Sequence, residues 1–213
     1  MSRDRTAYPA TLEIEYPATL NRLTTFFRLL LSIPIIIVLG ILSGSGGQSY
    51  AEESTKQVSS SGSGIAAGLG IATALLIIVR QRYPRWWFDF NVEFNRFSTR
   101  VAAYLFLLTD KYPSTVDKQS VHLDFAYPNV KKDLNRWLPL VKWLLALPHY
   151  VALVFLCLVS VIVTVIAWFS ILFTGTYPRS LFDFVVGVGR WGTRVNAYAF
   201  LLTTDQYPPF SLK

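Results

Sequence analysis

Two segments of the chain carry acids and arginines at the same spacing, and these residues are the best suited to bind a charged ligand. In each segment an Asp is followed by an Arg seven residues later and by a second Arg four residues after that. The residues are Asp89, Arg96 and Arg100 in the first segment and Asp183, Arg190 and Arg194 in the second. Spacings of seven and four place side chains on one helix face, and guanidinium groups bind phosphate through paired hydrogen bonds. The pattern indicates a candidate site for an anionic headgroup or a partner helix, with a purely structural surface helix as the alternative.

Aromatic and aliphatic residues recur at spacings of three and four on another face of the same two segments. Such a stripe beside arginines is typical of amphipathic helices that lie in the interface plane of a membrane. We therefore expect amphipathic helices over residues 85–109 and 179–203, with Trp86, Trp87 and Trp191 as interfacial anchors.

The chain offers little else for catalysis or metal binding. Its two histidines, His122 and His149, occupy unrelated places, and its single cysteine, Cys157, lies in an apolar run. The sequence contains no nucleophile elbow, phosphate-binding loop or zinc motif. We expect no catalytic residue, no metal site and no cofactor, and therefore a protein that is not an enzyme.

The composition is typical of a membrane protein. Hydrophobic residues make up 52% of the chain and charged residues only 15%, whereas soluble domains carry about 25% charged residues. So few ionic groups could not cover the apolar surface in water. The net charge of +7 is better explained by cationic residues at a membrane surface than by nucleic-acid binding, and we expect no nucleic acid among the partners.

The two helical segments belong to a larger internal duplication. One block, Leu-Asn-Arg followed by a basic residue and an apolar run, begins at residue 20 and recurs 114 positions later. A second block, from Tyr-Pro-Arg to Leu-Leu-Thr, begins at residue 83 and recurs 94 positions later. The first copy therefore has 20 extra residues, in the Ser- and Gly-rich stretch 43–64. We predict two repeats, residues 1–118 and 119–213.

Each repeat is predicted to contain a short strand, two apolar helices and one amphipathic helix. The predicted strands are 11–16 and 120–126, the spans are 20–43, 60–80, 134–157 and 160–176, and the outer loop is 44–63. The last two spans would be joined by a turn near residues 157–160. The predicted fold class is an all-α integral membrane protein with four transmembrane helices in two parallel tandem repeats. Whether the strands pair with each other or with another chain stays open.

The distribution of basic residues predicts the orientation in the membrane. Of the 20 Lys and Arg residues, only Lys56 falls in the predicted outer loop. The other basic residues fall on the side of both termini, and cytoplasmic segments are rich in Lys and Arg. We therefore expect a multi-pass protein with both termini in the cytoplasm.

Several motifs resemble a family of bacterial membrane proteins catalogued as domain of unknown function 4389. They are the Tyr-Pro-Arg-x-x-Phe-Asp-Phe blocks at 83–90 and 177–184, the Thr-Arg-Val-x-Ala-Tyr blocks at 99–104 and 193–198, and Leu-Leu-Thr-Asp-x-Tyr-Pro at 107–113. The resemblance covers nearly the whole chain and implies two tandem copies in a bacterial plasma-membrane protein. It implies no activity and no site, because the family has no assigned function.

The function that these observations favour is binding, as an accessory or scaffold subunit of a membrane complex. The expected partners are membrane lipids, including anionic ones, other membrane-complex subunits, and further copies of the chain. Two alternatives remain open. One is an oligomeric channel or transporter lined by the helices that Pro34 and Pro148 interrupt. The other is a protein that handles anionic lipid through the four arginines named above.

Overall fold

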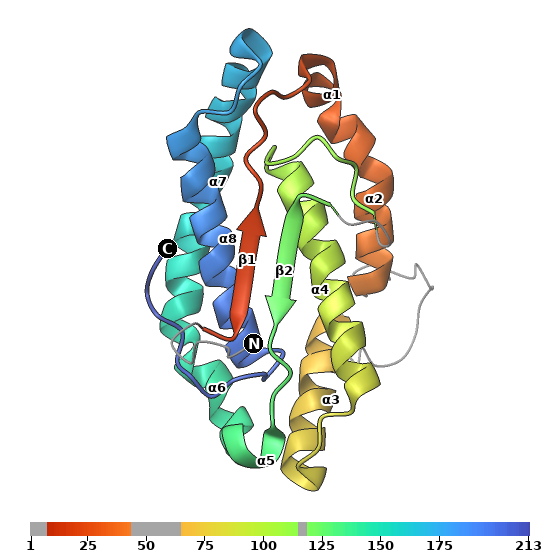
Figure 1. Ribbon diagram of the computed structural model, residues 1–213, viewed down its shortest axis with the longest axis vertical. Coiled ribbons are helices and arrows are strands. Elements are labelled where there is room, and N and C mark those ends of the chain that lie inside the picture. The colour runs from red at the N-terminus through yellow and green to blue at the C-terminus, as the bar shows by residue number, and fades with distance from the viewer. Residues whose placement is uncertain (1–7, 44–64, 115–118) are drawn as a thin grey trace, which may run out of the picture.

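The computed structural model describes residues 8–43, 65–114 and 119–213. In these residues the chain forms eight helices and two strands, which Figure 1 labels in chain order. The elements are β1 (Ala10–Ile14), α1 (Arg22–Phe26), α2 (Arg28–Ser43), α3 (Ile65–Arg80), α4 (Arg85–Leu105), β2 (Val121–Phe125), α5 (Val130–Asp133), α6 (Pro139–Leu145), α7 (Leu147–Thr174) and α8 (Arg179–Ala199).

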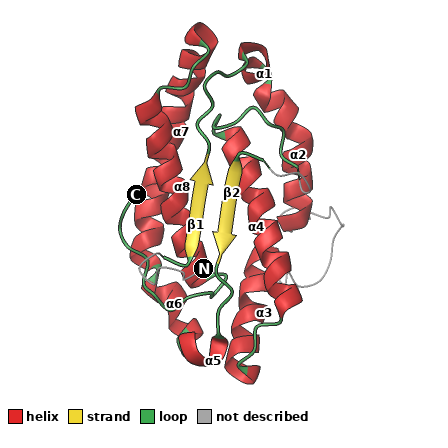
Figure 2. Ribbon diagram, in the orientation of Figure 1, coloured by secondary structure: helices red, strands yellow, loops and turns green. Residues whose placement is uncertain are grey.

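The two strands pair with each other at the centre of the molecule. They run antiparallel, with Leu12 opposite Leu123 and Glu13 opposite His122. Because apolar and polar residues alternate along both strands, the leucines point into the core while the charged residues stay exposed. Figure 2 shows α7 and α8 on the β1 side of this small sheet, with α2, α3 and α4 on the β2 side. The strands therefore pair within one chain rather than with a partner chain.

The amphipathic helices form where the sequence predicts them. Both start directly after a Tyr-Pro pair, because Pro fixes its own φ and lacks the N–H that a helix interior needs. Both end four residues before the predicted boundary, at Leu105 and Ala199. A left-handed residue follows each end, Leu107 with φ 63° and Leu202 with φ 55°. These turns direct the chain back toward the apolar helices.

The predicted set of four transmembrane helices is wrong. Helix α7 is one continuous helix of 28 residues, and no turn occurs near residues 157–160. Among the described residues, it alone is long and apolar enough to cross a membrane, and α2 and α3 have 16 residues each. The fold is mostly helical with a two-stranded sheet. The error has a plain cause: a long uncharged run fits one or two spans equally, and no Gly or Pro interrupts it between Pro148 and Gly175.

The matching sequence blocks relate α2 and α3 to α7. Shifted by 114 positions, residues 33–43 of α2 match 147–157 of α7, and shifted by 94 positions, α3 matches 159–174. The two short helices thus correspond to the two halves of α7. The predicted outer loop, residues 44–63, lies outside the described residues, and Lys56 with it.

The continuity of α7 can be tested with proline at its midpoint. We expect Leu158→Pro to destabilise the protein by about 3 kcal/mol or more, because proline removes a helical hydrogen bond and clashes with the preceding turn. Leu158 is exposed, so Leu158→Ala serves as the matched control and should cost far less. Unfolding in mild detergent measures both. A turn near residue 158 would instead tolerate the proline, and the two variants would then unfold alike.

Candidate functional site

The first arginine of each predicted set, Arg96 in α4 and Arg190 in α8, links its amphipathic helix to a strand by a hydrogen bond. The Arg96 Nε donates to the Leu123 carbonyl over 2.9 Å, and the Arg190 Nε donates to the Leu12 carbonyl over 3.1 Å. Arg96 also forms ion pairs of 2.6 Å with Glu93 and with Asp124. Its side chain is thus occupied by the protein's own acceptors, and these contacts anchor β2 on α4.

The second arginines hold the segments that follow each amphipathic helix. Arg100 donates to the Ser114 carbonyl over 2.6 Å, while Arg194 donates to the Ser211 and Lys213 carbonyls. Arg190 and Arg194 line one cleft of about 420 Å³ together with Glu13 and Lys213. Burial, followed by the nearby charge of Arg190, lowers the pKa of Arg194. The structure brings Arg190 and Arg194 together, whereas Arg96 and Arg100 contact different segments on the other side of the sheet.

The predicted acids of the site are far more exposed. Asp89 lies 3.9 Å from Arg85, and Asp183 lies 3.8 Å from Arg179, each pair one helical turn apart at the start of its helix. Exposed pairs of this kind contribute about 0.3–0.5 kcal/mol. Each acid thus pairs with an arginine of its own first turn, not with the arginines that the sequence groups with it.

The three predicted tryptophan anchors differ in their surroundings. Trp86 is exposed at 69% of its surface. Trp87 is half-buried and donates to the Thr73 hydroxyl over 2.9 Å, and the Trp191 Nε1 donates to His149 Nδ1 over 3.0 Å in the interior. Only Trp86 is therefore open to lipid in the manner of an interfacial anchor, while the other two pack the amphipathic helices onto α3 and α7.

Two buried ion pairs escaped the sequence analysis. Arg28 pairs with Asp110 and also donates to the carbonyls of Tyr104 and Thr109 over 3.0 and 2.9 Å. The Lys142 Nζ lies 2.6 Å from the Asp205 carboxylate and donates to the Thr204 carbonyl over 2.7 Å. Each cation also lies over an aromatic ring, Tyr104 at 4.6 Å and Tyr198 at 5.1 Å. The two arrangements are therefore the same structure built twice.

The carboxylates of these pairs also accept a backbone N–H from the residue seven positions before each cation. The second carboxylate oxygen of Asp110 accepts from the backbone N–H of Asn21 over 2.6 Å. The second oxygen of Asp205 accepts from the backbone N–H of Asn135, also over 2.6 Å. Burial lowers the pKa of Lys142, and Asp205 opposes that shift. Each pair thus joins the entrance of an apolar helix to the chain that leaves an amphipathic helix. The signal was present in the sequence, since residues 28 and 142 are both basic and each repeat ends in Asp-x-Tyr-Pro.

One comparison with known proteins gives a match. Residues 137–211 match the family described as Domain of unknown function (DUF4389). This region holds Lys142, Asp205 and the whole of α7 and α8. The resemblance drawn from the motifs is supported for the second repeat, while a second DUF4389 copy and a bacterial origin stay predictions. Searches of the curated proteins and of the solved structures found no match.

The Lys142–Asp205 pair should contribute strongly to stability. The side chain of Lys142 is fully buried, so Asp205→Ala leaves an uncompensated charge inside the protein, which costs about 3–5 kcal/mol. Asp183→Ala is the matched control, because it breaks an exposed pair worth about 0.5 kcal/mol or less. Unfolding of both variants in the same detergent measures the difference. Equal losses of stability would contradict the structural role assigned to Asp205.

Proposed function

We propose that the chain is a non-enzymatic membrane protein that acts by binding, with one apolar side embedded along a bilayer and a polar side facing water. The observation that carries this proposal is the outward apolar surface of α7. In the most apolar stretch of 18 residues in α7, only 11% of the residues are buried inside the protein. The core helix of a soluble protein would be mostly buried, so lipid is the natural cover for this surface.

The exposed surface of α7 extends over its full length. Phe155 is 73% exposed and Phe173 is 77% exposed, with Ile162 between them. Exposed apolar side chains continue on α2 at Leu29 and on α3 at Val79. Helix α1 packs on both α2 and α7, and α6 packs on both α3 and α7. The exposed surfaces of α2, α3 and α7 therefore belong to neighbouring elements rather than to isolated helices. Together they supply the apolar side of the molecule.

The position of the sheet favours α7 lying along the membrane. Figure 1 shows both strands at the centre of the molecule, along the same long axis as α7. Their outer face exposes Glu13, Glu15, His122 and Asp124. If α7 crossed the bilayer, these groups would sit near its mid-depth, where ionised side chains are costly. A helix lying along the membrane keeps them in water.

Paired contacts support two tandem copies of the DUF4389 unit. The Tyr16 hydroxyl donates to the Tyr177 carbonyl over 2.5 Å, and the Tyr127 hydroxyl donates to the Tyr83 carbonyl over 2.5 Å. Each bond links one repeat to the other. The resulting twofold pattern leaves a polar face suited to an accessory or scaffold role toward lipids, other subunits or another copy. The bacterial plasma membrane as location, with cytoplasmic termini, stays a prediction.

Labelling from one side of the membrane tests the orientation. In a Cys157→Ser background, single cysteines at Trp137→Cys and Thr174→Cys mark the two ends of the α6–α7 segment, and both positions are exposed. If α7 lies along the membrane, a membrane-impermeant maleimide should label both positions from the same side of sealed vesicles of one orientation. Labelling from opposite sides would show that α7 crosses, and labelling after permeabilisation provides the control.

The natural cysteine tests the contact with lipid. Cys157 is exposed near the middle of α7 and is the single cysteine of the chain, so a spin label reports on this site without further substitution. In reconstituted vesicles we expect the label to be relaxed by oxygen, which concentrates among acyl chains, and to be shielded from a water-soluble nickel chelate. A label that is freely accessible to the nickel chelate would contradict the embedding of α7.

A further inference from the structure

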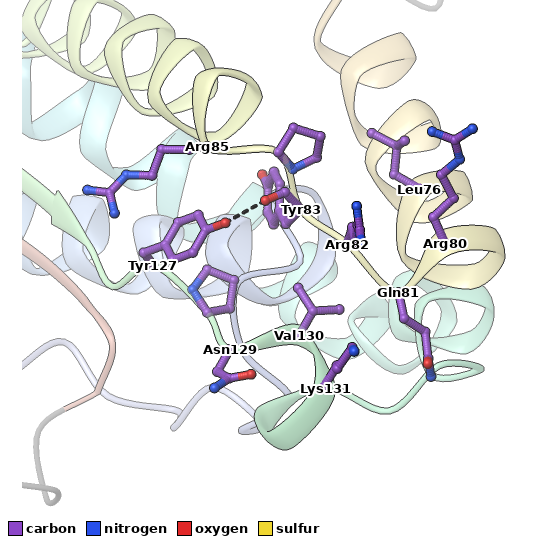
Figure 3. A pocket seen from close by; sticks show the side chains of 12 residues that line it. Leu76, Arg80, Gln81, Arg82, Tyr83, Arg85, Tyr127, Asn129, Val130 and Lys131 are labelled. Atoms are coloured by element: carbon purple, nitrogen blue, oxygen red, sulfur yellow. Dashed lines mark hydrogen bonds between the residues drawn. The ribbon is translucent and has the colours of Figure 1, made fainter.

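A cleft of about 660 Å³ at one end of the molecule is lined by four basic side chains. It lies between the end of α3, the start of α4 and the segment that leads from β2 into the first turn of α5. Arg80 and Arg82 come from the first of these regions, Arg85 from the second and Lys131 from the third. Figure 3 shows Arg82 and Lys131 on the two sides of Val130, with Arg80 above them and Arg85 extended along Tyr127. Four cations thus gather from three separate elements.

Little negative charge balances this cleft, and the nearby carboxylate of Asp133 is already bonded to the backbone N–H of Asn129 over 3.2 Å. In the described part of the chain, no carboxylate lies within ion-pairing distance of Arg80, Arg82 or Lys131. Arg85 has only the long, exposed contact with Asp89 described above. The start of α4 also lines the cleft, and Pro84 provides no side-chain cap for the amides there. Helix N-termini carry partial positive charge. The cleft is therefore electropositive and accessible to an anion.

The opposite end of the molecule shows that these cations are not needed to build the junction. There Tyr16 bonds to Tyr177, and Arg179 lies 4.7 Å from the Tyr16 ring, as Arg85 lies 5.0 Å from the Tyr127 ring. Yet 94 positions after Arg80 and Arg82 stand Thr174 and Thr176. The same tyrosine junction forms without two of the cations. The tyrosine junction therefore does not account for Arg80 and Arg82.

The backbone at Gln81 gives a second, independent sign. Gln81 ends α3 in the left-handed region, with φ 46°, and the matched residue after α7 is Gly175, with φ 76°. Glycine adopts this conformation freely, whereas a residue with a Cβ is strained there. Gln81 lines the cleft. At the cleft the chain therefore keeps a residue with a side-chain amide in a strained backbone conformation, where the matched position in the second half is glycine.

We propose that this cleft binds the phosphate group of an anionic ligand, with Arg80, Arg82 and Lys131 as the main charged contacts and Gln81 as a hydrogen-bonding partner. Guanidinium groups match phosphate oxygens in pairs, and a lysine adds a point charge. Leu76 supplies an apolar wall from α3. Val79, one turn further along the same helix, is exposed. A phospholipid headgroup with its chains along α3 and a free phosphate share this chemistry. The lipid source rests on the proposed embedding in a bilayer.

Lipid retention by the full-length protein tests the proposal. The protein is purified in mild detergent after reconstitution with phosphatidylglycerol or with phosphatidylcholine, and the bound lipid is counted by native mass spectrometry. The variants are Arg80→Ala/Arg82→Ala, Gln81→Gly and, as the matched control, Arg179→Ala. We expect phosphatidylglycerol to be retained over phosphatidylcholine, the double variant to lose at least tenfold in retention, and the control to behave as the natural chain. Gln81→Gly should bind more weakly while unfolding at a higher temperature.

A competition arm separates the two phosphate sources. Displacement of phosphatidylglycerol by inorganic phosphate at millimolar concentration would assign the cleft to a small phosphate compound, and resistance to it would assign the cleft to lipid. Equal loss of lipid in the Arg179→Ala control, or no loss in the double variant, would overturn the proposal. Flotation of the same variants with vesicles keeps the two ideas apart: a variant that floats but retains no lipid has lost the cleft alone, and a chain that never floats contradicts the embedding.

Discussion

The structure depends on two buried ion pairs that connect the apolar helices α2 and α6 to the segments that follow the amphipathic helices α4 and α8. A cation inside a protein is costly unless a carboxylate and further acceptors surround it. Arg28 and Lys142 each receive one carboxylate, backbone carbonyls and the face of a tyrosine ring. These partners hold the start of the apolar helices against the ends of α4 and α8. The left-handed residues Leu107 and Leu202 make that approach possible, because they turn the chain back just before each Asp.

The remaining contacts bind the two repeats into one unit. Strand β1, from the first repeat, packs on α8 of the second, while Arg190 of α8 donates to the Leu12 carbonyl. The tyrosine hydroxyl bonds at the two ends also run from one repeat to the other. Each repeat therefore relies on contacts from the other repeat to pack its strand and its amphipathic helix. This exchange places the two-stranded sheet between the helices of the first repeat and those of the second (Figure 2).

The sequence allowed some of these features to be predicted and concealed others. Period-2 alternation located both strands, and the aromatic stripe located both amphipathic helices, because local periodicity reports which face is buried. It could not show whether the run after Pro148 turns, since an apolar residue is equally suited to a lipid-facing or a helix-facing position. The four arginines of α4 and α8 were identifiable as a set, but their acceptors are carbonyls of distant segments, which no residue type marks. The same limit applies to Arg28, because nothing in the local sequence marks Asp110 as the partner against which it is buried.

The differences between the two repeats carry more functional information than their likeness. Features that occur at both ends, such as the tyrosine bonds and the ion pairs, are explained by the need to hold the same junction twice. Arg80, Arg82 and the strained Gln81 occur at one end, where Thr174, Thr176 and Gly175 satisfy the same backbone at the other. A residue that the fold does not require, and that holds the backbone in a strained conformation, is a candidate for contact with a ligand or partner. The matched positions in the second half of the chain thus serve as an internal reference for what the fold alone requires.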